Sequence, residues 1–221
     1  MRKPRLTVPG YPHHVIVRGN NRRRLFSYRD DYWCYLRFLA QGLARHPVAL
    51  HAMTLMTNHV HLLLTPSTDV ALTKLMHYTG MRYSRCRNDR RGASGKLFEE
   101  RFHSFPVLSD GQLAVVTAYI ELNPVRAGMR PHALGRRFST HGLHVGRADR
   151  SDVPRGIWTP SAWYLSLGAT DGERAARYRQ WIEDCQRFER RPENFTIIEA
   201  LEIITTGRDH RLRRPSEQRA A

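Results

Sequence analysis

The chain has 221 residues, enough for one sizeable domain or for one domain with an appendage. Its apolar fraction of 41% and charged fraction of 25% are ordinary for a globular protein, but a net charge of +16 favours a polyanionic partner. Cys34, Cys86 and Cys185 are far apart, which argues against a disulfide framework and a thiolate zinc site. Because no apolar run is long enough for a membrane span, we expect a soluble, cytoplasmic protein, and its basic charge favours association with the nucleoid.

Apolar periodicity and turn residues predict the secondary structure of the first 130 residues. In chain order we expect a strand at 14–18, a helix at 30–45, strands at 48–56 and 59–64, a helix at 70–88, a strand at 102–108 and a helix at 110–123. Asp110 is the expected cap of the last helix, and Pro124 is expected to end it. This order predicts an α+β fold, a ferredoxin-like antiparallel sheet with helices packed on one face.

The rest of the chain is patterned more weakly. Residues 131–160 are rich in Gly, His and Arg and are expected to form a linker or a loosely ordered arm. A clear apolar face predicts a helix at 173–190, whereas 195–205 fits a helix or a strand. We therefore expect a catalytic domain at 1–130, a partly helical C-terminal extension at 131–206 and a basic, disordered tail at 207–221.

The most informative stretch is Asn58-His59-Val60-His61, which three leucines follow. Side chains alternate along a strand, so His59 and His61 project to one face about 7 Å apart, where a single metal ion can join their rings. On a helix the same spacing would turn them roughly 200° apart. His-x-His alone is a weak indication. The ordinary alternative is one histidine at a strand edge and one in a polar network.

A second segment supplies two further groups. Tyr119 and Asn123 are four residues apart and thus share one face of the predicted helix. Two neutral imidazoles and an amide oxygen make a three-point site that suits Mg²⁺ or Mn²⁺ when a substrate phosphate completes the shell. The competing interpretations are a core tyrosine and an asparagine that only turns the chain. Tyr78 and Tyr83 are rival tyrosines, but neither has Asn or Gln four residues later.

Several segments carry a family resemblance: GYPHHV at 10–15, RGNNR at 18–22, MTNHVHLL at 56–63, GKLFEERF at 95–102 and YIELNPVRAG at 119–128. In this order they resemble the IS200-type single-tyrosine transposases and, more narrowly, their REP-associated branch, the RAYT proteins. The resemblance covers about residues 8–130. Residues 131–221 are only loosely similar to the C-terminal extension of that branch.

The resemblance implies a histidine-hydrophobic-histidine (HUH) endonuclease that cuts single-stranded DNA beside hairpin-forming palindromic repeats. Carried over position by position, His59 and His61 hold the divalent metal, Asn123 is the third ligand, and Tyr119 is the nucleophile. Attack by the phenolate gives a 5′-phosphotyrosine and a free 3′-hydroxyl, which conserves the bond energy for strand transfer. No single residue identifies itself as the base that accepts the tyrosine proton. The branch and the extension favour a monomer or a weak dimer.

The expected DNA contacts are basic or polar side chains near the motifs, because phosphate neutralisation supplies most non-specific affinity. They are Arg18, Asn21, Arg22, Arg82 and Arg101. Aromatic residues lie among these charges, and one or two of them can stack on bases. The candidates are Tyr11, Phe26, Phe98 and Phe102, with core packing as the alternative for Phe98 and Phe102.

Two other functions remain open at this point. One is a catalytically silent, basic DNA- or RNA-binding regulator that keeps the same fold. The other is an RNA-processing or plasmid-nicking enzyme with similar chemistry and a different substrate. The presence of His59, His61, Tyr119 and Asn123 together argues against the first, because a protein that only binds has no need for all four.

Overall fold

The computed structural model describes residues 7–99 and 101–189. The first elements are β1 (His13–Arg18), the 3₁₀ turn η1 (Asn20–Arg22), α1 (Arg29–Leu43), β2 (Val48–Leu55), β3 (His59–Pro66), α2 (Ala71–Asp89), β4 (His103–Pro106) and α3 (Asp110–Arg126). The predicted strands and helices are all present, with bounds that differ by a few residues.

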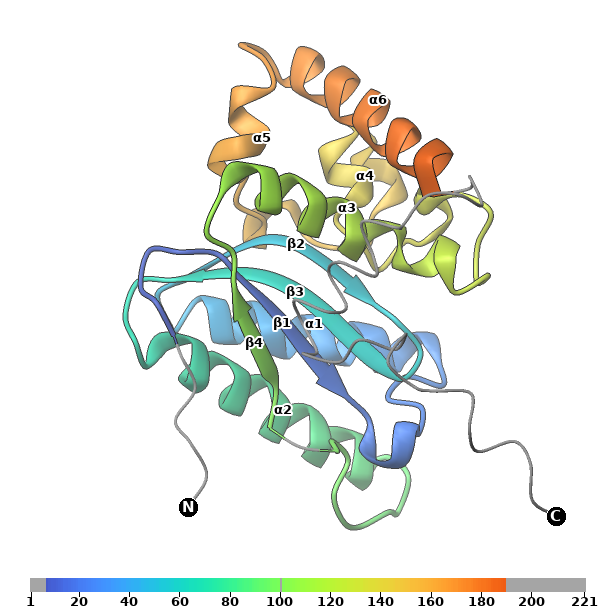
Figure 1. Cartoon of the computed structure of the whole chain (residues 1–221). Coiled ribbons are helices and arrows are strands. Elements are labelled where there is room, and N and C mark those ends of the chain that lie inside the picture. The colour runs from blue at the N-terminus through green and yellow to red at the C-terminus, as the bar shows by residue number, and fades with distance from the viewer. Residues whose placement is uncertain (1–6, 100, 190–221) are drawn as a thin grey trace, which may run out of the picture.

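The strands form one four-stranded sheet in the order β2-β3-β1-β4, and every pair of neighbours is antiparallel. The helices α1 and α2 pack on each other and cover one face of this sheet (Figure 1). The predicted ferredoxin-like α+β fold is therefore confirmed. The opposite face carries α3, the helix that contains Tyr119.

Alternation along the two central strands sorts side chains between these faces. Val15 and Val17 of β1, with Val60, Leu62 and Leu64 of β3, belong to the main core beneath the sheet. There they meet apolar residues of α1 and α2, including Tyr35, Leu36, Leu39, Leu72 and Leu75. Each fully buried side chain of this size contributes about 1.5–3 kcal/mol. The intervening residues of both strands consequently face α3. They include His59 and His61 of β3.

The helix α3 departs from the sequence prediction at both ends. Ser109, and not Asp110, is the N-cap, and its hydroxyl accepts the N–H of Gln112 at 3.3 Å. The expected stop at Asn123 is also wrong, because the helix runs on to Arg126 with Pro124 inside it. Pro124 has no N–H to donate, but the residues that follow it keep theirs. The carbonyl of Asn123 still accepts the N–H of Ala127 at 3.0 Å, so one further turn forms.

The segment 131–160 is packed against the sheet, and the prediction of a linker or a loosely ordered arm is wrong. It contains η2 (Ala133–Gly135), α4 (His141–His144), η3 (Ala148–Arg150) and η4 (Arg155–Ile157). Its backbone pairs with the outer edge of β2: the N–H of Leu55 donates to the carbonyl of Phe138 at 3.0 Å, and that of Thr159 to Leu50 at 2.8 Å. Covering an exposed strand edge is thus the role that local periodicity did not reveal.

Two further helices complete the extension, α5 (Ala162–Ser166) and α6 (Asp171–Glu189). The second confirms the helix expected at 173–190. Both pack on the outer side of α3 through an apolar cluster that includes Leu122, Tyr164, Tyr178 and Ile182. The segments 195–205 and 207–221 lie outside the described residues. Within 7–99 and 101–189, none of the helices has the length and apolarity needed to cross a bilayer.

Candidate active site

Three histidines and one tyrosine meet between the sheet and α3. The ring centroids of His59 and His61 lie 4.8 Å apart. The Tyr119 ring lies 5.5 Å from His61 and 5.6 Å from His14, edge-on to both. A cluster drawn from β1, β3 and α3 therefore joins chain segments that are more than 40 residues apart.

The packing of α3 explains why Tyr119 reaches this cluster. Val116 and Ile120 of α3 pack on Ala52 and Leu63 of the sheet in a cluster of buried residues. Tyr119 lies at the border of that cluster and is half-buried. The apolar contacts thus orient the helix, while the phenol remains at the edge where a substrate can approach.

His59 is held by two side chains. Its Nδ1 donates to the Oδ1 of Asn58 at 2.7 Å, and Asn58 in turn donates its amide to the carbonyl of Arg22 at 3.1 Å. The side chain of Asn123 also interacts with His59. Burial, assisted by the charge of Arg18, lowers the pKa of His59 to about 4. The imidazole is accordingly neutral at physiological pH and can offer a lone pair.

His61 lies deeper, and its side chain is almost fully buried. Its Nδ1 is 3.0 Å from the Nε2 of His14. Burial, together with the nearby His59, His14 and two arginines, lowers the pKa of His61 well below 6.5. Burial alone lowers the pKa of His14 to about 3. The cluster is therefore built from uncharged imidazoles, the form that binds metal ions.

The donor set fits a divalent cation that shares its shell with substrate. Among the described residues, no group of three or more His, Cys, Asp or Glu side chains is arranged to hold a metal ion. Two neutral imidazoles and the amide of Asn123, which interacts with His59, leave room for phosphate and water oxygens. Such a set can hold a divalent cation with modest affinity.

Arg126 is a residue of the site that sequence reasoning did not single out. Its guanidinium carbon lies 4.6 Å from the centre of the Tyr119 ring. A cation over an aromatic face is attracted by the ring electrons, so Arg126 belongs to the immediate surroundings of Tyr119. Arg126 follows Tyr119 by seven residues, which is two helical turns, and this spacing could have indicated that they share one face of the helix.

The predicted DNA contacts divide between the two faces of the sheet. Arg18 lies opposite His59 in the β1–β3 register, and η1 with Asn21 and Arg22 follows directly. Asn21 and Arg22 have positive φ angles of 51° and 57°, so this turn has an unusual backbone at the edge of the site. Arg82 on α2 and Arg101 beside β4 are exposed, and the structure does not bring them to Tyr119.

The rival aromatic residues are engaged elsewhere. Tyr83 is fully buried between α1 and α2, where its hydroxyl donates to the carbonyl of Leu25 at 2.6 Å. Tyr78 lies on α2 between Arg45 and Arg82. Phe26 is also buried, and its stacking on Tyr32 excludes the predicted stacking on a DNA base. Tyr119 is consequently the tyrosine that stands beside the histidine pair.

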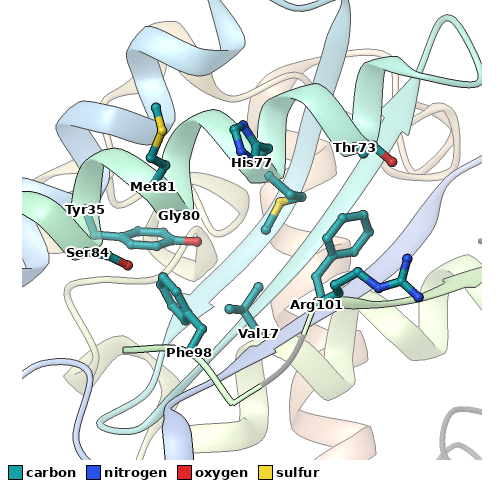
Figure 2. A pocket seen from close by; sticks show the side chains of 11 residues that line it. Val17, Tyr35, Thr73, His77, Gly80, Met81, Ser84, Phe98 and Arg101 are labelled. Atoms are coloured by element: carbon teal, nitrogen blue, oxygen red, sulfur yellow. The ribbon is translucent and has the colours of Figure 1, made fainter. Parts of the chain in front are cut away.

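A separate cavity of about 320 Å³ lies on the α2 side of the sheet. Figure 2 shows Phe98, Val17 and Tyr35 around it, with Arg101 at its margin. Its walls are mainly apolar side chains from α2, β1 and the segment before β4. The sheet separates this cavity from Tyr119, so it is not part of the candidate active site.

A buried polar network, which was not predicted from the sequence, lies on α3 beside the site. Glu121 is fully buried on α3 and accepts four hydrogen bonds from the extension. The donors are Thr140 at 2.6 Å, His141 at 2.9 Å, His144 at 2.7 Å and Tyr178 at 2.7 Å. Burial would raise the pKa of Glu121, but His144 and His141 outweigh it and hold that pKa well below its usual range.

The fold and the site together define a class: a ferredoxin-like sheet that presents an imidazole pair from a central strand to a tyrosine on the covering helix. The sequence model of the IS200-like transposases matches residues 7–123, which is more than half of the chain. The protein therefore belongs to the IS200-like transposase family. No curated protein matches the chain in sequence.

The solved structures that are similar in fold include that of a REP-associated tyrosine transposase bound to a REP hairpin. The TM-score is 0.58 at 17% sequence identity, and the match covers 73% of this chain and 92% of the other. At this identity the similarity concerns the fold. It extends beyond the first 130 residues, and the C-terminal part of this chain is partly helical.

Proposed function

We propose that the protein is a metal-dependent endonuclease and strand-transferase of single-stranded DNA, in which Tyr119 is the nucleophile. The observation that supports this most directly is the position of the Tyr119 ring, 5.5 Å from His61, whose ring is in turn 4.8 Å from His59. Membership of a transposase family supports the same reaction class.

In the proposed reaction the Tyr119 oxygen attacks the scissile phosphate. The bond between phosphorus and the phenol oxygen forms, and the bond to the 3′-oxygen of the neighbouring nucleotide breaks. The products are a 5′-phosphotyrosine and a 3′-hydroxyl, which takes up a proton equivalent to the one that the phenol loses. A bound divalent cation would withdraw charge from the phosphate oxygens during this step. Strand transfer is the reverse attack by a 3′-hydroxyl.

The other residues of the site have supporting roles in this proposal. His59, His61 and Asn123 would hold the cation, and Arg126 would stabilise charge on the phenol oxygen. Arg18, Asn21 and Arg22 line the edge at which the strand would enter. Phosphate contacts of this kind give affinity without sequence information.

The proposed substrate is DNA with hairpin-forming repeats, cut beside the foot of the hairpin. The net charge of +16 supports a nucleic-acid partner. The similar solved structure is bound to a REP hairpin, which supports a hairpin in particular. Arg82 and Arg101, on the far side of the sheet, would then contact the duplex stem and not the strand that is cut.

Incubation of the intact protein with Mn²⁺ and labelled hairpin oligonucleotides tests the proposal. We expect a covalent protein–DNA adduct with the wild type and none with Tyr119→Phe. Tyr78→Phe is the matched control and should retain the adduct. Tight hairpin binding without an adduct on any strand would contradict the proposed enzyme and support a regulator that only binds nucleic acid.

A further inference from the structure

His14 is a buried histidine of the site that the proposed reaction does not use. It lies on β1, its side chain is 1% exposed, and its Nε2 is 3.0 Å from the Nδ1 of His61. The two rings are nearly parallel, with 23° between their planes. The Nδ1 of His14 is buried and has no hydrogen-bond partner among the described residues.

A neutral imidazole carries one N–H donor and one acceptor nitrogen. A single proton therefore lies between His14 and His61, and two arrangements are open to the pair. If His61 donates from Nδ1, its Nε2 keeps a lone pair that can bind a cation. If His14 donates from Nε2 instead, the proton of His61 lies on Nε2, where it blocks that lone pair.

The tautomer of His59 indicates which of the two arrangements His61 adopts. His59 donates its Nδ1–H to the Oδ1 of Asn58 at 2.7 Å. The Asn58 amide is oriented by its own donation to the carbonyl of Arg22, so its oxygen faces His59 and the lone pair of His59 is on Nε2. His14 stands in the same relation to His61, since it too contacts Nδ1. Both imidazoles of the pair are thus supported from the same ring position.

We propose that His14 is a positioning residue for His61. It accepts the Nδ1–H of His61, which fixes the ring orientation and the tautomer that offers Nε2 to the cation. Histidines that bind metal ions generally donate their other ring N–H to a fixed acceptor. This inference rests on the proposed function, in which His61 binds the cation.

Mn²⁺ binding by the intact protein without DNA, measured by electron paramagnetic resonance at constant pH, tests this role. Removing such a supporting partner weakens metal binding by about 10–100-fold, which is the loss we expect for His14→Phe. His14→Gln retains an acceptor oxygen and should recover most of the affinity. His13→Phe is the matched control, because His13 is adjacent on β1 but faces the opposite side of the sheet.

A second measurement uses the wild-type protein and therefore does not require a variant to fold. Nitrogen-15 NMR of the wild-type histidines with saturating Mg²⁺ should show the proton of His61 on Nδ1. Equal Mn²⁺ affinity in wild type and a folded His14→Phe variant would overturn the positioning role while leaving the proposed function intact. A proton on the Nε2 of His61 would overturn the positioning role together with the assignment of His61 as a cation ligand. A wild-type protein that binds no Mn²⁺ would overturn the proposed function and this inference together.

Discussion

At the residue scale, the site depends on imidazoles that burial keeps uncharged. The pair His59 and His61 could be predicted from the sequence, because alternation along a strand is a local property. His14 was not among the site residues expected from the sequence, and its contact with His61 depends on the β1–β3 register. His14 and His61 are 47 residues apart in the chain, and the register between their strands follows from tertiary packing. The local sequence pattern could therefore not predict this contact.

Replacing His61 by alanine tests the metal role of the pair. We expect adduct formation to fall at least about 100-fold, because a bound cation supplies several kcal/mol of charge stabilisation. Hairpin affinity should remain close to that of the wild type, since arginine–phosphate contacts supply most of it. Gel-shift titration and adduct formation are measured on the same preparations. His51→Ala, a truncation of a buried histidine on the edge strand β2, is the control that should keep both activities. Parallel loss of binding and cleavage in His61→Ala would indicate a folding role instead.

At the element scale, α3 is held from both sides. One side packs on the sheet through Val116 and Ile120, and the other is bonded to the extension through Glu121. The elements with strong periodicity were predicted to within a few residues. The segment 131–160 was not, because its Gly-, His- and Arg-rich sequence has no period, and its order comes from pairing with β2 and from the Glu121 network.

Glu121→Gln is expected to destabilise the protein by about 3–5 kcal/mol, the usual cost of breaking a buried charged network. The amide keeps the size of the side chain, but it removes the charge and places an NH2 group where one carboxylate oxygen now accepts two of the four hydrogen bonds. Urea unfolding of the intact chain measures the change. Glu183→Gln, at an exposed position on α6, is the matched control and should change stability by less than about 0.5 kcal/mol. Equal unfolding midpoints for both variants would contradict a stabilising role of the network.

At the scale of the whole molecule, the layers are α1 and α2, the sheet, α3 and the outer helices (Figure 1). The sequence predicted a sheet with helices packed on one face, because a strand order with short connections leaves few alternatives, but it did not place α3 on the opposite face. It did not predict that the extension would form a fourth layer. Burial between these layers also affects charge: several histidines that would titrate near neutral pH in an unfolded chain are neutral in the fold.

Stability should accordingly fall as the pH is lowered from 7 to 5. The pKa is lowered from 6.5 to about 4 in His59 and to about 3 in His14. Below pH 6.5 the unfolded chain therefore binds protons that the folded chain does not, so the free energy of unfolding decreases. Each of these histidines contributes a loss of about 2 kcal/mol at pH 5. Urea unfolding at pH 7, 6 and 5 in EDTA measures it. The lowered pKa of Glu121 changes the free energy of unfolding mainly below the ordinary value of 4.5, which lies outside the range from pH 7 to 5. A free energy of unfolding that is constant from pH 7 to 5 would contradict neutral burial.

The attachment site of DNA tests the central claim most directly. After reaction of the wild type with a hairpin oligonucleotide and Mn²⁺, nuclease and trypsin digestion followed by mass spectrometry identifies the peptide that carries the nucleotide. We predict residues 102–126, a tryptic peptide in which Tyr119 is the only tyrosine. A nucleotide on residues 75–82, which contain Tyr78, or on any other peptide would contradict the assignment of Tyr119 as the nucleophile.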